Sequence, residues 1–400
     1  MDTKSLKTKL QKTINTVRSE KESSKETNPI KAWLSSRTPS VDLAALAELV
    51  KELRNHPELI IFDDKMQVLE NSRYGVDYDS LGNWLVFRAL QVGTDNAIAD
   101  LERYVNNSHF EYYQTMALSG IQIEDELQFT NGIKLVPLSS IPDTIHKVML
   151  ENFMSPFGTL ARPSTALIRT LSHPRIHLSS KDDLPRNTNT LIDWRREFED
   201  VRLCLTLIGP SSSIDLGSWV TFVDWVPCAS PGWSPSLIPH TMQFIINRRL
   251  DPNDYDRARG IHDLFLKLNL KYQEQLRVSL SRLNSAILQS PSVSSAIDLR
   301  TAMESTFLND IGGDSGELSF RLRLRAARWL SKNGETQKVL FDNFRELYRL
   351  CSGAVHKGYI PKKFQTKKQE MLEEGCKQVA KAIELIIYNQ GVDWDSIIFS

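Results

Sequence analysis

The chain has 400 residues, 41% of them hydrophobic and 24% charged, enough apolar material to bury the cores of about two or three domains. Its 49 basic and 49 acidic residues cancel, so total charge alone does not indicate a polyanion partner. The polar start lacks the apolar core of a signal peptide, and no apolar run approaches the roughly eighteen residues of a membrane span. The sequence therefore predicts a cytoplasmic protein that does not contact a membrane.

The N-terminal part of the sequence predicts a lead-in followed by a mixed region. Residues 1–30 are rich in Lys, Ser, Thr and Glu, a composition typical of a flexible polar segment. Residues 31–254 combine helical and strand patterns. Leucines at helical spacing predict a helix near 41–55, and Asn131-Gly132 between alternating stretches predicts a β-hairpin. The stretch "TLIDWRREFEDVRLCLTLI" suits a helix and "SWVTFVDWVP" suits a strand.

Residues 255–392 change to long helical patterns with few prolines. The expected helices cover residues 256–269, 271–289, 293–308, 317–332, 336–356 and 365–389. We therefore expect an α+β protein, with a mixed α/β N-terminal region followed by a C-terminal all-α helical bundle.

Metal and cofactor chemistry finds little support in the sequence. Cysteines 204, 228, 351 and 376 form no CxxC pair, so buried thiols are expected rather than disulfides or a zinc site. His173 and His177 have the spacing of a helical metal pair, but Pro174 opposes the helix that this spacing requires. The glycine-bearing "IGGDSG" carries no lysine and predicts an interhelical turn rather than a nucleotide loop. We expect neither a metal nor a cofactor.

One predicted helix carries a polar face of special interest. In "RELYRLCSGAVHKG", Arg345, Arg349, Ser352 and His356 stand at i, i+4, i+7 and i+11, so all four share one face. Seven residues advance a helix by about 10.5 Å. Arg349 and His356 could therefore both reach one bound phosphodiester without touching each other.

Local charge supports a polyanion at this part of the chain. Residues 321–370 hold thirteen Lys or Arg against four acidic residues, a net charge of +9. Arg321, Arg325, Arg328 and Lys332 share a face of the preceding helix, which could follow a phosphate backbone. The alternative is a solvated bundle surface whose cations pair with acids elsewhere in the fold.

The C-terminal third resembles the HEPN superfamily, in particular its ApeA-like branch of bacterial proteins. The resemblance covers about residues 257–389 and depends on several weak motifs in a consistent order. These are Met303-Glu304 at the end of one helix, Arg325-Ala326 in the next, and the tyrosine, arginine, small residues and Val-His of "LYRLCSGAVHKG" in a third. The mixed region before them is similar to the N-terminal part common in such proteins.

This resemblance implies a metal-independent ribonuclease. His356 would act as general acid/base and Arg349 as the phosphate clamp, leaving a 2′,3′-cyclic phosphate. It also implies RNA as partner, a homodimer formed through the motif helix, and a role in antiviral defence or a toxin-like system. The N-terminal region would sense a protein trigger. The further residues expected to contact nucleic acid are Arg345, Ser352, Arg321, Arg325, Arg328 and Lys357.

The motif also departs from the ApeA-like pattern. Cys351 holds the position where that pattern usually has its arginine, and Arg349 instead leaves six residues before His356. Leu350 follows Arg349 where a polar residue is common. These departures favour an alternative, a catalytically silent HEPN module for dimerisation and for binding RNA or a partner protein. Glu304 is expected to be a structural partner of an arginine rather than a general base.

Overall fold

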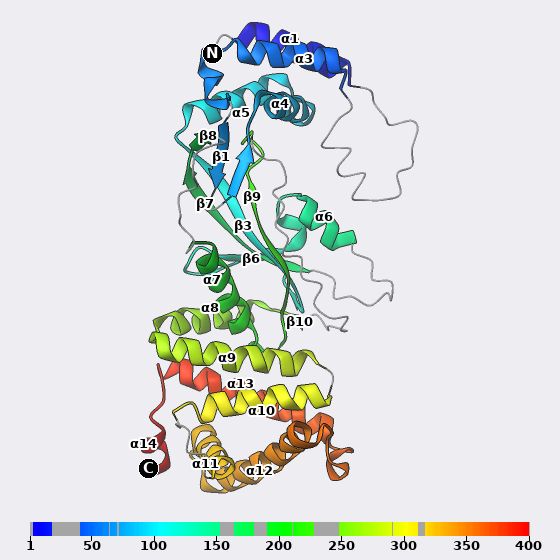
Figure 1. Ribbon diagram of the computed structural model, residues 1–400. Coiled ribbons are helices and arrows are strands. Elements are labelled where there is room, and N and C mark those ends of the chain that lie inside the picture. The colour runs from blue at the N-terminus through cyan, green and yellow to red at the C-terminus, as the bar shows by residue number, and fades with distance from the viewer. Residues whose placement is uncertain are drawn as a thin grey trace.

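The computed structural model describes residues 3–17, 41–63, 65–69, 72–152, 164–179, 190–209, 211–227, 248–289, 291–310 and 317–399. The fold is α+β, as the sequence predicts, with its strands between residues 65 and 249 and a helical region in the C-terminal third. The two ends of the chain lie at opposite ends of the molecule (Figure 1).

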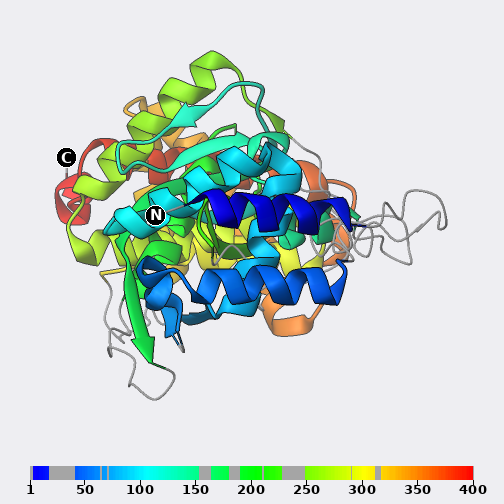
Figure 2. The ribbon, with the colours of Figure 1, turned by 90° about the horizontal axis from the view of Figure 1, so that it is seen from above.

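Helices form a layer at the N-terminal end. They are α1 (Thr3–Asn15), α3 (Leu43–Arg54), the short η2 (Pro57–Phe62), α4 (Tyr78–Val92) and α5 (Thr94–Asn106). Asp42 and Asp77 cap α3 and α4, each accepting a hydrogen bond from an amide in the first turn. Helices α1 and α3 lie side by side above the sheets (Figure 2). The helix predicted near residues 41–55 is therefore present.

The flexible lead-in predicted for residues 1–30 is wrong for residues 3–15, which form α1. Leu6 and Leu10 are fully buried in an apolar cluster with α3 and α4. Their i, i+4 spacing places both on one face of the helix, and this stripe is invisible in a composition dominated by lysine and threonine. Residues 18–30 of the predicted lead-in lie outside the described residues.

Among the described residues, three sheets occupy the middle of the molecule. The largest has the order β5-β6-β7-β3-β9, and the long strand β3 at its centre pairs antiparallel with β7 and with β9. The chain passes from β7 directly into β8, which belongs to a three-stranded sheet of order β2-β1-β8. The third sheet is a parallel pair of β4 and β10. The strands are β1 (Lys65–Leu69), β2 (Ser72–Gly75), β3 (His109–Ser119), β4 (Ile121–Gln122), β5 (Leu127–Gln128), β6 (Lys134–Pro137), β7 (Thr165–Pro174), β8 (Ile176–Ser179), β9 (Ile214–Phe222) and β10 (Arg248–Arg249).

The predicted hairpin is confirmed at its turn. β5 and β6 pair antiparallel, with Leu127 opposite Leu135. Gly132 has a φ of +78°, a left-handed conformation that glycine adopts without the strain other residues would incur. The first half of the predicted strand "SWVTFVDWVP" lies in β9, whereas residues 223–227 are not in a strand, and the predicted helix before it corresponds to α7 (Thr190–Leu205). Two shorter elements, η3 (Leu138–Ser140) and α6 (Ile145–Asn152), follow β6.

The C-terminal region contains all six predicted helices. They are α8 (Pro252–Lys267), α9 (Leu270–Leu288), α10 (Val293–Phe307), α11 (Leu318–Leu330), α12 (Gly334–Lys357) and α13 (Lys368–Tyr388), with the short η4 (Lys362–Phe364) and α14 (Trp394–Phe399). Side-chain caps begin four of them, through Asp251, Asn269, Ser292 and Asn333. The glycine-bearing turn predicted at 311–316 lies outside the described residues.

The division at residues 254 and 255 does not separate two cores. The largest apolar cluster runs from Met116 and Leu118 of β3, through Phe198 of α7, to Ile383 and Ile387 of α13. A second cluster lies under the N-terminal helices, and a small third cluster includes Trp219 of β9. The bundle therefore shares its core with the inner end of the large sheet.

The docking of α1 can be tested with Leu10→Ala. Because Leu10 is fully buried against α3, its truncation should lower the free energy of unfolding by about 2–5 kcal/mol. Chemical denaturation measures this change. Ser5→Ala, on the exposed side of the same helix, should change stability by less than about 0.5 kcal/mol. Equal effects of the two substitutions would contradict the docking of α1.

Candidate nucleic-acid interface

The candidate site lies on α12, whose ends the sequence defines locally. Asn333 begins the helix by accepting hydrogen bonds from the amides of Glu335 and Thr336. Gly358 ends it in a left-handed conformation, with a φ of +68°. The buried residues of α12 are Phe344, Leu347, Leu350, Cys351, Gly353 and Ala354. Packing of this stripe turns the predicted polar face outward.

The structure places Arg349 and His356 on the exposed side of α12, whereas Arg345 and Ser352 are partly buried. Lys357 is also exposed. No hydrogen bond links the Arg349 and His356 side chains among the described residues, as expected for positions seven residues apart.

His356 makes its contact with a different helix. Its Nε2 atom lies 3.4 Å from Nη1 of Arg300, which belongs to α10. The Nε atom of Arg300 donates to Oε1 of Glu304 at 2.8 Å, and Nη2 donates to the hydroxyl of Tyr348 at 3.1 Å. Tyr348 in turn donates to Oε1 of Glu304 at 2.9 Å. These four residues form a connected group between α10 and α12.

Burial and the charge of Glu304 shift the pKa of Arg300 in opposite directions and that of Tyr348 in the same direction. Burial would lower the pKa of Arg300, but the hydrogen bond and charge of Glu304 outweigh it and the pKa is raised. Burial raises the pKa of the Tyr348 hydroxyl, and the charge of Glu304 adds to this effect. Arg300 is therefore a fixed cation and Tyr348 a neutral hydroxyl. Glu304 partners an arginine, as the sequence analysis expects.

Arg349 has an acidic partner on its own helix. Its Nη1 atom donates to Oε1 of Glu346 at 2.8 Å, and the Arg349 side chain is 58% exposed. Lys363 of η4 donates to the other oxygen of Glu346, Oε2, at 3.1 Å, and Nε of Arg345 lies 3.6 Å from Oε1. Burial would raise the pKa of Glu346, but hydrogen bonds from Lys363 and Arg349 lower it. Arg345 also pairs with Asp342 at 3.2 Å, so two carboxylates face three cations and one positive charge remains in excess here.

The small residues beside His356 pack against other parts of their own chain. A side chain at Gly353 would lie 2.6 Å from Pro361, because the chain folds back over this position after α12. Cys351 and Ala354 are also buried in the core. Because their own chain covers them, Cys351, Gly353 and Ala354 are not available as the seam of a dimer. Gly353 serves the close internal contact.

The predicted basic face of α11 is only partly available. Arg325 is 4% exposed and makes two hydrogen bonds to Asp310, at 2.6 and 2.9 Å, and one to the carbonyl of Phe307 at 2.8 Å. Its guanidinium also lies 5.2 Å from the ring centre of Trp394. Assigning Arg325 to nucleic-acid contact is therefore wrong, since a phosphate backbone cannot reach it. Arg321 is exposed and Arg328 partly buried.

The other histidine and cysteine predictions can be compared with the structure. His173 lies in β7 and His177 in β8, so the stretch between them is not helical, as Pro174 predicts. Within the described residues, no group of His, Cys, Asp and Glu could hold a metal ion. Cys204, Cys351 and Cys376 are buried free thiols, as expected, and burial raises the pKa of Cys376 to about 12. Cys228 lies outside the described residues.

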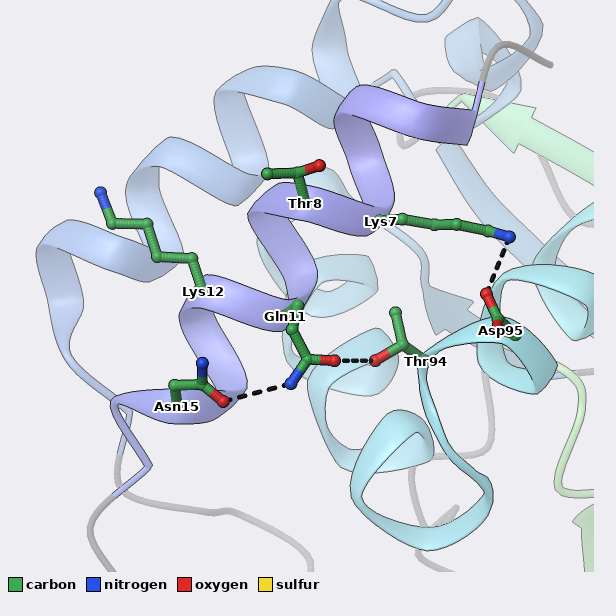
Figure 3. Close-up of a pocket in the computed structure, with 7 residues that line it drawn as sticks. All are labelled: Lys7, Thr8, Gln11, Lys12, Asn15, Thr94 and Asp95. Carbon is green, nitrogen blue, oxygen red and sulfur yellow. Dashed lines mark hydrogen bonds and ion pairs between the residues drawn. The ribbon is translucent and has the colours of Figure 1, made fainter.

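A shallow depression of about 550 Å³ lies at the other end of the molecule, between α1 and the start of α5. Gln11 stands at its centre, accepting from Thr94 and donating to Asn15, and Lys7 pairs with Asp95 at 2.7 Å (Figure 3). These polar side chains satisfy one another across the two helices. We therefore interpret the depression as part of the contact between α1 and α5 rather than as a ligand site.

Sequence reasoning missed Arg300 and the role of Tyr348. The i, i+4 spacing of Arg300 and Glu304 was a readable signal for an ion pair on α10. The contact of that pair with α12 depends on how the two helices pack, which spacing along the chain does not reveal.

The chain was compared with protein-family models, with curated proteins and with solved structures, and none of them matches it. In the described part of the chain, no helix has the length and apolarity needed to cross a membrane.

Arg325 is expected to stabilise the fold rather than to bind nucleic acid. Replacing it by Met would remove its hydrogen bonds to Asp310 and leave the buried carbonyl of Phe307 without this donor, so the free energy of unfolding should fall by about 1–3 kcal/mol. Arg321→Met, on an exposed position of the same helix, should change stability by less than about 0.5 kcal/mol. Thermal and urea unfolding of both variants measure this difference. An Arg325→Met protein as stable as the parent would contradict the assignment.

His177 should make stability depend on acid. Burial lowers its pKa from 6.5 to about 4, and its ring nitrogens face the hydroxyl of Tyr104 and the carbonyl of Ile61. The unfolded chain therefore binds this proton at a higher pH than the folded one, so stability should fall as pH drops from about 7 to 4.

The matching experiment measures urea unfolding against pH for the parent and for His177→Gln. The variant should lose part of the acid-dependent slope. The remaining slope includes His146 and His262, whose pKa values burial also lowers. Identical slopes for the parent and the variant would refute the role of His177.

Proposed function

We propose that the protein is a metal-independent endoribonuclease of HEPN type, acting at the surface formed by α10 and α12. The single observation that carries the proposal is an exposed histidine, His356, beside a fixed arginine cation on a surface where positive charge exceeds negative. RNA supplies the matching chemistry, because it joins a dense row of phosphates to a 2′-hydroxyl that can act as the nucleophile.

The reaction follows from the chemistry of the histidine. The ribose 2′-oxygen attacks phosphorus, the bond from phosphorus to the 5′-oxygen breaks, and the products are a 2′,3′-cyclic phosphate and a 5′-hydroxyl. His356 takes the proton of the 2′-hydroxyl or gives one to the leaving oxygen. Arg349, the clamp residue of the motif, binds the RNA backbone beside the scissile phosphate together with Arg345, Ser352 and Lys357 on the same helix.

A homodimer would complete such a site. One histidine cannot at the same moment accept one proton and donate another, whereas two copies of α12 related by a two-fold axis supply two histidines. Val355 and Tyr359, next to His356, are 42% and 51% exposed, and these apolar groups suit contact with a second copy. The setting is a cytoplasmic antiviral defence or toxin-like system in bacteria, with the N-terminal region recognising a protein trigger.

A second candidate is a catalytically silent HEPN module that dimerises and binds RNA or a partner protein. The specific observation in its favour is the pairing of Arg349 with Glu346, a carboxylate shared with Lys363. An arginine held in this way contributes to a surface ion-pair network and need not act on a phosphate. The ribonuclease test below separates the two functions.

The test incubates the purified full chain with total RNA in the presence of a chelator. The parent should produce fragments that end in a 2′,3′-cyclic phosphate, detected by end-specific ligation. His356→Ala should reduce the rate by about 10²–10⁴-fold, because proton transfer by a positioned side chain contributes this much. Arg349→Ala should also reduce it, and His109→Ala, an exposed histidine on β3, is the matched control and should cleave like the parent.

Three outcomes would count against the ribonuclease. Cleavage that survives both His356→Ala and Arg349→Ala would place the site elsewhere. Cleavage abolished by the chelator would contradict a metal-independent reaction. A parent that binds RNA without cutting it would support the silent module, even if overexpression of the protein is toxic to the cell.

A further inference from the structure

Arg300 is held from two sides and directed toward a third. Its Nε atom donates to Glu304 at 2.8 Å and its Nη2 atom donates to the Tyr348 hydroxyl at 3.1 Å. The guanidinium lies 4.9 Å from the ring centre of Tyr348, and the Arg300 side chain is only 16% exposed. Two of its three nitrogens are therefore fixed, which orients the third, Nη1, toward His356 at 3.4 Å.

A protonated His356 would place a second positive charge beside Arg300, and a bound anion would stabilise this pair. A guanidinium can only donate hydrogen bonds, so a direct contact requires Nε2 of a neutral His356 to accept. Imidazolium donates from both nitrogens, so the two groups would then face each other as donors and cations. An anion placed between them would accept from both, and the exposure of His356 leaves that position open to solvent.

We propose that Arg300 and His356 together bind one phosphate group, with Nη1 of Arg300 and Nε2 of His356 donating to its oxygens. The proposal rests on the proposed function in that this phosphate is the scissile phosphodiester of RNA. It identifies a phosphate-binding residue outside the α12 motif, on a helix that the motif does not include.

The competing arginine is less well placed. Arg349 lies seven residues before His356, its side chain is 58% exposed, and Glu346 already accepts from it at 2.8 Å. Binding phosphate through Arg349 would require breaking this pair and ordering a long exposed side chain. Arg300 incurs neither cost, because Glu304 and Tyr348 hold it in place before the ligand arrives.

The test follows phosphate binding directly and does not need cleavage. The ring signals of the eight histidines are recorded by NMR on the full chain, and His356→Gln assigns the His356 signal. Inorganic phosphate is then added at constant ionic strength, with chloride as the screening control. A single-stranded oligodeoxynucleotide, which lacks the 2′-hydroxyl and is not cleaved by this route, is the second probe.

In the parent, both probes should shift the His356 signal and the shift should saturate. Arg300→Met should weaken binding by about tenfold or more, as expected for losing a charge-assisted hydrogen bond. Arg259→Met, which removes a surface arginine of α8 that pairs with Asp256 of the same helix, is the matched control and should bind like the parent.

A second substitution keeps the test decisive if Arg300→Met does not fold. Arg300→Lys retains the charge near Glu304, but one ammonium group cannot serve Glu304, Tyr348 and a phosphate in the same geometry. It should therefore fold, as thermal unfolding would show, and bind phosphate about fivefold or more weakly. Parent-like binding by the folded lysine variant, or loss of binding in Arg349→Met with binding kept in the Arg300 variants, would overturn the proposal.

The outcomes separate this inference from the proposed function. Arg300-dependent phosphate binding in a protein that never cleaves RNA would support the site and reject the ribonuclease. RNA cleavage that needs His356 but proceeds normally in Arg300→Met would support the ribonuclease and reject Arg300 as a phosphate-binding residue.

Discussion

The shared core between the inner end of the large sheet and the helical bundle is the constraint on which the rest of the structure depends. β3 contributes buried residues to all three apolar clusters, so one strand joins the N-terminal helices to the bundle. Asn284 of α9 reinforces this junction by bonding both backbone groups of Ser213, at 2.9 and 3.0 Å, at the entrance to β9. The two ends of the molecule therefore share a continuous packed interior, which transmits strain better than a flexible linker would.

How much could be predicted from the sequence varied with the range of the interactions. The bundle helices were predictable because long helical patterns with few prolines are local signals, although α8 begins at Pro252, before the predicted residue 256. The hairpin turn was predictable because Asn131-Gly132 demands one backbone geometry. The docking of α1 was missed because the burial of Leu6 and Leu10 depends on α3, a helix that is distant in the sequence. The shared core was missed for the same reason.

The candidate site shows the same difference between what local patterns predict and what tertiary packing decides. Helical periodicity places Arg349 and His356 on one face. It does not reveal which basic side chains form ion pairs or hydrogen bonds inside the folded protein. The sequence pattern places Arg325 in a basic stripe. In the structure Arg325 is instead buried against Asp310, because that turn of α11 faces the end of α10. Arg300 reads as an ordinary residue of an apolar helix and instead contacts His356. Both outcomes are decided by tertiary packing, which overrides a charge pattern read along the chain.

The two arginines near His356 illustrate what converts a cation into a binding group. A surface guanidinium such as that of Arg349 is solvated, mobile and partly neutralised by Glu346, so much of its attraction for an anion is lost to water and entropy. Arg300 is mostly buried and fixed by Glu304 and Tyr348, and the same two residues leave one nitrogen for a ligand. Because Glu304 balances the charge on the far side of the guanidinium, the protein can keep Arg300 buried while no ligand is bound. Preorganisation of this kind, more than the number of basic residues, makes the surface between α10 and α12 suited to one phosphate beside one histidine.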